Sequence, residues 1–179
     1  MALDTAEWTV EQRDRLPDDG NKYEVVAGEL FVTPAPSLRH QVIAGALGES
    51  LRPFVLEHRL GLVFALDTDV IEGKHNVVMP DVAVYPFTRE NLPAGWAVAP
   101  RPILVAEIRS PTTWRRDVGP KRDLYVALGI PDYWIVDADD RTVTVVRPGH
   151  RDEVVSDILR WHPAGASLPH EIDVPTLLR

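Results

Sequence analysis

The order of hydrophobic patterns along this chain predicts an α/β (α+β) fold, in which helices pack against a mixed β-sheet. Short apolar segments of strand length alternate with two longer segments of helical periodicity, and residues 103–108 form an apolar run typical of a buried central strand. The chain has 179 residues, of which 45% are hydrophobic and 26% charged, as in ordinary globular proteins. We therefore expect a single domain that spans residues 1–179.

The first third of the chain should form two helices and a strand pair. Thr9 and Gln12 have the spacing of a capping box, and Gly28 stands where a turn between two strands needs a positive φ. Ser37 is a good N-cap for a long helix, in which Pro53 should cause a bend or an end. These elements are expected at residues 9–16 (helix), 23–26 and 29–32 (strands) and 37–58 (helix).

The remainder of the chain should supply most of the sheet and one further helix. Gly129 follows the apolar face of the second long helix, at the position of a C-terminal cap. After residue 146 no strong pattern continues, so a looser tail is expected. The predicted strands cover residues 62–66, 77–85, 103–108, 133–136 and 142–146, and the predicted helix covers residues 117–128.

Composition and charge exclude several classes of protein. The chain contains no cysteine, which excludes disulfides, iron–sulfur clusters, thiolate zinc sites and cysteine nucleophiles. Its net charge of −8 argues against a protein that coats nucleic acid through its overall field. No apolar stretch is long enough for a membrane helix, and Asp4 and Glu7 do not fit a signal peptide. We expect a cytoplasmic protein that does not bind membranes.

Two acidic residues stand at the polar ends of apolar strands, where an unpaired carboxylate is costly. Asp81 follows Pro80, and Glu107 lies inside the run 103–108. Each could form a buried ion pair with an arginine. Together with Lys121 on the predicted second long helix, the two acids could instead hold a hard divalent cation, Mg²⁺ or Mn²⁺, beside a phosphate.

A series of short motifs surrounds these residues. The motifs are Tyr23–Glu24, Gly28–Glu29–Leu30, Pro36–Ser37 with His40, Pro80–Asp81, residues 107–113, Lys121–Arg122 with Tyr125, and residues 129–137. In this order they resemble the Uma2 family of restriction-endonuclease-like proteins, over the chain from Thr9 onward. The resemblance implies the PD-(D/E)XK nuclease superfamily, with a restriction-endonuclease-like mixed β-sheet core flanked by helices, a divalent metal and hydrolysis of DNA phosphodiester bonds.

The resemblance also implies roles for individual residues. Asp81 and Glu107 would bind the metal, and Lys121 would be the catalytic cation. At position 109 the superfamily has lysine, whereas this chain has Arg109, which would support phosphate binding. His40 could face the metal or a phosphate, although a lone histidine is often a surface or capping residue. Glu24 could be a third acid near the metal or could pair with Arg or Lys.

Two further patterns bear on partners. Residues 101–122 contain six basic and two acidic residues, which would suit a phosphate-bearing substrate or simply a solvated helix start. Tyr133 and Trp134 are expected in the core rather than stacked on bases. Trp161, expected to be exposed, could contribute to a homodimer contact, because nucleases that cut both strands are often two-fold dimers.

The sequence thus favours a magnesium-dependent endonuclease with Asp81, Glu107 and Lys121 as its catalytic residues. Two alternatives stay open. One is an inactive binding or assembly protein that keeps the nuclease fold, and the other is a metal-dependent hydrolase of a small phosphate compound, which would better suit an acidic protein.

Overall fold

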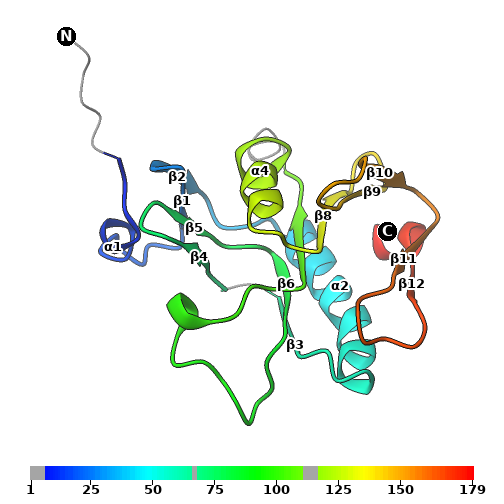
Figure 1. The fold of residues 1–179 in the computed structure, drawn as a ribbon. Helices are drawn as coiled ribbons and strands as arrows, with labels where there is room; N and C mark the ends of the chain where they lie inside the picture. Colours follow the sequence, from blue (N-terminus) through cyan, green and yellow to red (C-terminus); the bar gives the residue numbers. More distant parts are fainter. Residues whose placement is uncertain (1–6, 66–67, 111–116) are drawn as a thin grey trace.

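The computed structural model describes residues 7–65, 68–110 and 117–179. The largest sheet in the structure has six strands (Figure 1). In spatial order the strands are β10 (Glu153–Val155), β9 (Thr142–Val146), β8 (Asp132–Asp137), β7 (Leu104–Ile108), β6 (Val82–Tyr85) and β3 (Leu62–Ala65). Strands β7 and β8 are parallel and all other neighbours are antiparallel. The sheet is therefore mixed, as predicted.

Two smaller sheets accompany it. The first is antiparallel, in the order β2 (Glu29–Thr33), β1 (Lys22–Val26), β5 (Asn76–Val78) and β4 (Val70–Glu72). The second pairs β11 (Ile158–Trp161) with β12 (His170–Asp173). Among the described residues, the helices are α1 (Val10–Arg13), α2 (Leu38–Glu57), the 3₁₀ turn η1 (Trp96–Val98), α4 (Pro120–Ala127) and α5 (Val174–Leu177).

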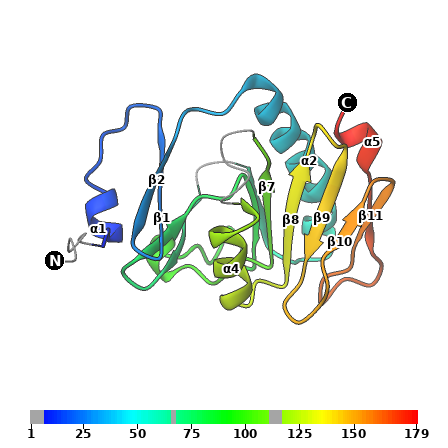
Figure 2. The same ribbon diagram turned by 90° about the horizontal axis from the view of Figure 1, so that it is seen from above.

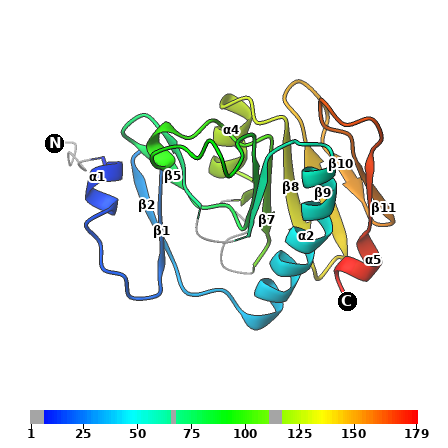
Figure 3. The same cartoon turned by 90° about the horizontal axis from the view of Figure 1, so that it is seen from below.

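Helices α2 and α4 cover opposite faces of the six-stranded sheet (Figures 2 and 3). In strand β7, successive side chains alternate between these two faces. Leu104, Ala106 and Ile108 pack in the core that contains α2, whereas Val105 packs with Tyr125 of α4. Glu107 is an odd-numbered residue of this strand, so its side chain is directed to the α4 face, together with that of Val105.

The local signals in the first third of the sequence are confirmed. Thr9 and Gln12 form the capping box of α1, and Ser37 caps α2. The turn between β1 and β2 has Ala27 at φ 50° and Gly28 at φ 78°. Helix α2 continues through Pro53 to Glu57, so the helix expected over residues 37–58 is confirmed and the proline does not end it.

The expected single strand over residues 77–85 is wrong. The structure divides this segment into β5 and β6, which belong to different sheets. The break falls at residues 79–81, where Pro80 has no N–H to donate and the N–H of Met79 donates to Glu24 instead of to a neighbouring strand. The short strand β4 was not predicted at all, because its three residues carry no clear period.

The expected loose tail is also wrong, since β10, β11, β12 and α5 follow residue 146. Trp161 is completely buried, not exposed. Its ring lies edge-on to Trp134, and its Nε1 donates a hydrogen bond of 3.1 Å to Asp132 Oδ2. A buried side chain does not supply a subunit contact, so the reason for proposing one at Trp161 falls away. Tyr133 and Trp134 lie in the core, as predicted.

Within the described ranges, no helix combines the length and the hydrophobicity that crossing a membrane requires.

Candidate active site

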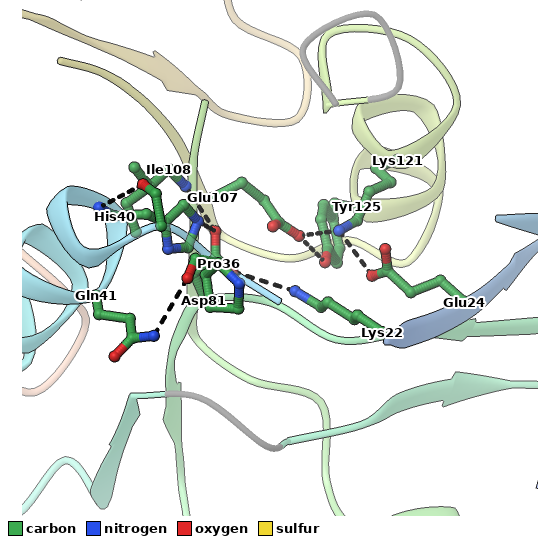
Figure 4. Close-up of polar contacts among 11 residues, drawn as sticks. Lys22, Glu24, Pro36, His40, Gln41, Asp81, Glu107, Ile108, Lys121 and Tyr125 are labelled. Carbon is green, nitrogen blue, oxygen red and sulfur yellow. Dashed lines mark hydrogen bonds and ion pairs between the residues drawn. The ribbon is translucent and has the colours of Figure 1, made fainter. Parts of the chain in front are cut away.

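A cavity of about 680 Å³ lies where β1, the start of α2, the start of β6, the end of β7 and α4 meet. Asp81 and Glu107 both line it, and both are almost fully buried, with 5% and 3% of their surface exposed. Lys22, Lys121 and His40 also line the cavity. The structure therefore brings the two predicted metal ligands and the predicted catalytic cation into one space (Figure 4).

Asp81 is held by three donors from three different parts of the chain. Lys22 Nζ lies 3.1 Å from Oδ1, and His40 Nε2 lies 3.0 Å from Oδ2. The backbone N–H of Ile108 donates to Oδ2 at 2.8 Å. Burial alone would raise the pKa of the Asp81 carboxyl, but Lys22 and His40 hold that pKa far below its usual value. Asp81 is therefore ionised at neutral pH.

Glu107 forms the other half of the site with residues of α4. Lys121 forms an ion pair with Glu107 Oε1, and Tyr125 Oη donates to the same oxygen at 2.9 Å. Burial raises the pKa of Glu107 above its usual value, and the Asp81 charge adds to the rise. The neighbouring charge of Lys121 acts in the opposite direction and favours the ionised form of Glu107.

Lys121 lies between two carboxylates. Its Nζ donates to Glu24 Oε1 at 2.8 Å as well as contacting Glu107, and only 1% of its side chain is exposed. Burial by itself would lower the pKa of Lys121, but the charges of Glu107 and Glu24 raise it far above its usual value. Lys121 is therefore a permanent cation at any working pH.

The secondary structure places these side chains by simple periodicity. Lys22 and Glu24 are two residues apart on β1 and so project from the same face of that strand. Lys121 and Tyr125 are four residues apart on α4 and share one side of the helix. His40 lies in the first turn of α2, where its N–H donates to the cap Ser37 Oγ at 3.3 Å.

Of the six site residues predicted from the sequence, the structure brings together Glu24, His40, Asp81, Glu107 and Lys121. Arg109 does not line the cavity. It pairs with Asp137 and lies 3.9 Å from Asp140, at the start of the turn between β8 and β9. The ion-pair alternative considered for the buried acids is present as well, but with lysines instead of arginines.

Sequence reasoning missed two residues that contact the acids, Lys22 and Tyr125. The spacing of Lys22 and Glu24, two apart on a predicted strand, was the available signal for the first. The spacing of Lys121 and Tyr125 on a predicted helix was the signal for the second. Neither spacing indicates which acid the side chain contacts, because Asp81 is distant from Lys22 in the sequence and Glu107 is distant from Tyr125.

The basic segment 101–122 does not form a free basic rim in the part of the chain that the structure describes. Arg101 pairs with Glu72 at 3.0 Å, Arg122 pairs with Asp152 at 2.7 Å, and Arg109 pairs with Asp137. The predicted contributions of Arg115 and Arg116 lie outside the described residues.

The donor set fits a magnesium ion better than a metal held entirely by protein. Among the described residues, no group of three or more His, Asp or Glu side chains could surround a cation. Mg²⁺ is commonly held by one or two carboxylates and completes its coordination with waters and substrate phosphate oxygens. Asp81 and Glu107, both carboxylates in one cavity, match that pattern.

Both the sequence and the fold of this chain resemble those of known proteins. The model of the Uma2 family, described as "Putative restriction endonuclease", matches residues 10–176. A solved structure described as a "putative nuclease belonging to DUF820", from Anabaena variabilis, superposes with a TM-score of 0.75 at 24% sequence identity, covering 95% of this chain and 97% of the other. No curated protein matches the sequence. The structural likeness supports the nuclease-like fold, and the family match spans nearly all of the sequence, so this chain belongs to the Uma2 family.

Proposed function

We propose that this chain is a magnesium-dependent endonuclease that hydrolyses DNA phosphodiester bonds. One observation carries the proposal: two buried carboxylates, Asp81 and Glu107, line the same cavity from neighbouring segments of the sheet. Lys121 lies in contact with Glu107. Membership of the Uma2 family, whose description is "Putative restriction endonuclease", supports the same reaction.

In this proposal Asp81 and Glu107 hold Mg²⁺ or Mn²⁺. The metal, when bound, would polarise the phosphate and favour ionisation of a water molecule. The protein keeps both carboxylates in place before any cation arrives. His40 and the N–H of Ile108 fix Asp81, and Tyr125 fixes Glu107. Such preorganisation lowers the reorganisation needed during the reaction.

Lys121 would act as a fixed positive charge. Because its pKa is raised, it keeps its proton and is unsuited to be a general base. Its ammonium group can instead donate a hydrogen bond to the attacking water or offset the negative charge that develops on the phosphate. Glu24 anchors this ammonium group from the side of β1, and the N–H of Met79 in turn donates to Glu24 Oε1 at 2.7 Å.

A second candidate is a hydrolase of a small phosphate ester. The cavity favours it in one respect. Among the described residues that line the cavity, the lysines are Lys22 and Lys121, and both are paired with carboxylates. Binding of a DNA duplex relies on several basic groups that neutralise successive phosphates, whereas one small phosphate ester needs fewer.

The test is cleavage of supercoiled plasmid at low salt, with Mg²⁺ and with EDTA. We expect nicking that requires the metal and is lost in Asp81→Asn and Glu107→Gln. Glu49→Gln is the matched control, because Glu49 is an exposed residue of α2 away from the cavity. An intact plasmid together with metal-dependent hydrolysis of bis(p-nitrophenyl) phosphate would favour the second candidate. Wild-type protein that hydrolyses neither substrate would contradict both.

A further inference from the structure

Lys22 is the more accessible of the two lysines in the site. Its Nζ lies 3.1 Å from Asp81 Oδ1, and 23% of its side chain is exposed. Lys121, in contrast, is 1% exposed and contacts two carboxylates. Part of the Lys22 side chain is therefore open to solvent, whereas Lys121 is enclosed.

The two oxygens of Asp81 differ in how they are held. Oδ2 has two partners, His40 Nε2 and the backbone N–H of Ile108, which fix the orientation of the carboxylate. Within the described part of the chain, the contact at Oδ1 is with Lys22 alone. A divalent cation that used Oδ1 would have to take the place of Lys22. The ammonium group sits on a flexible four-carbon chain, so it can move without a change in the backbone.

We propose that Lys22 is an exchangeable counter-ion and a phosphate-binding residue. It neutralises Asp81 while no metal is bound, and it pairs with the substrate phosphate once a divalent cation occupies Asp81 Oδ1. The inference rests on the proposed function, because it assumes that Asp81 is a metal ligand. The lysine ammonium group suits the second role, since it binds phosphate as a point charge, and it already lines the same cavity as both acids.

The first readout is metal affinity, measured by calorimetric titration of Mn²⁺ without substrate. Lys22→Met removes a positive charge that competes with the metal, so the dissociation constant should fall by about fivefold or more. Lys22→Arg keeps the charge and should stay near the wild-type value. Lys74→Met is the matched control, because Lys74 is exposed and does not line the cavity. A merely structural Lys22 would give weaker metal binding in the Met variant, not tighter.

The second readout is plasmid cleavage at saturating metal. Lys22→Met should raise KM by about tenfold, with a smaller change in kcat, and Lys22→Arg should restore most of the loss. If the Met variant does not fold, Lys22→Gln removes the same charge and serves in its place.

The outcomes separate the two proposals. Wild-type protein that binds no metal would overturn both of them. Wild-type protein that binds metal and cuts DNA, with a Lys22→Met variant unchanged in either the dissociation constant or KM, would overturn only the role of Lys22.

Discussion

Asp81 Oδ2 accepts a hydrogen bond of 2.8 Å from the backbone N–H of Ile108, the residue that follows Glu107. The bond joins the two acidic positions through the backbone. It continues the antiparallel pairing of β6 with β7, in which Val82 lies opposite Ala106. The spacing of the two carboxylates is therefore set by strand register, and a slip of one residue would turn Glu107 toward the α2 face.

Replacing Lys121 should destabilise the fold strongly. Lys121→Met leaves Glu24 and Glu107 buried without their shared cation, which should lower the free energy of unfolding by about 3–5 kcal/mol. Urea unfolding at pH 7 measures this loss. The double variant with Glu24→Gln should recover part of it, because one of the two buried charges is then removed.

Lys74→Met provides the control for that experiment, since the exposed Lys74 should change stability by less than about 0.5 kcal/mol. Equal effects of Lys121→Met and Lys74→Met would contradict the buried-charge account of the site.

Gly61 should tolerate no side chain. Its φ is +135°, and a Cβ built there would lie 1.9 Å from the carbonyl oxygen of Tyr85, which pairs with Leu62 in the ladder of β3 and β6. Gly61→Ala should therefore cost about 3 kcal/mol or more, because a backbone strand would have to move.

The comparison for Gly61 is Gly129→Ala. Gly129 also has a positive φ, +68°, but a Cβ there meets nothing within 4 Å. Only the strain of the left-handed conformation should then appear, about 1–2 kcal/mol. Thermal or urea unfolding measures the stability that each variant loses. Equal losses in Gly61→Ala and Gly129→Ala would refute the steric argument.

His170 should make stability depend on pH. Burial lowers the pKa of His170 below its ordinary value of 6.5, against a smaller raising effect from Ser50. The unfolded chain therefore binds a proton more readily than the folded chain, so this residue reduces stability as pH falls below about 6.5. Its Nε2 lies 3.0 Å from Ser50 Oγ, and its ring stacks on Phe54.

Urea unfolding of wild-type protein and His170→Asn at several pH values between 7.5 and 5 checks this expectation. The free energy of unfolding of the wild type, relative to that of the variant, should decrease as pH falls. A difference that stays constant across this range would show that His170 does not titrate as proposed.

Local sequence signals were enough to predict much of the fold. The capping box at Thr9, the cap at Ser37 and the turn at Gly28 each depend on a few neighbouring residues, and each is confirmed. The division of residues 77–85 into two strands has a local signal in Pro80, which has no N–H to donate. The group that accepts the N–H of Met79 is not local, because it belongs to Glu24, 55 residues away in the sequence.

The candidate site shows the same limit. Asp81, Glu107 and Lys121 could be proposed as site residues because charged residues beside apolar strands are unusual and because their motifs resemble a family. The pairing of Lys22 with Asp81 joins residues 59 apart, and no local pattern specifies it. The resemblance implied a phosphate-binding role for Arg109, but no sequence pattern indicates that its side chain pairs with Asp137, 28 residues away.

The most direct test of the central claim, that Asp81 and Glu107 form one metal site for phosphodiester cleavage, is calorimetric titration of Mg²⁺ and Mn²⁺ into wild-type protein, Glu107→Ala and Glu49→Gln. Each protein is then incubated with supercoiled plasmid. The account predicts metal binding and nicking in the wild type and in Glu49→Gln, and neither in Glu107→Ala. Wild-type protein that binds no metal and leaves the plasmid intact at low salt would contradict it.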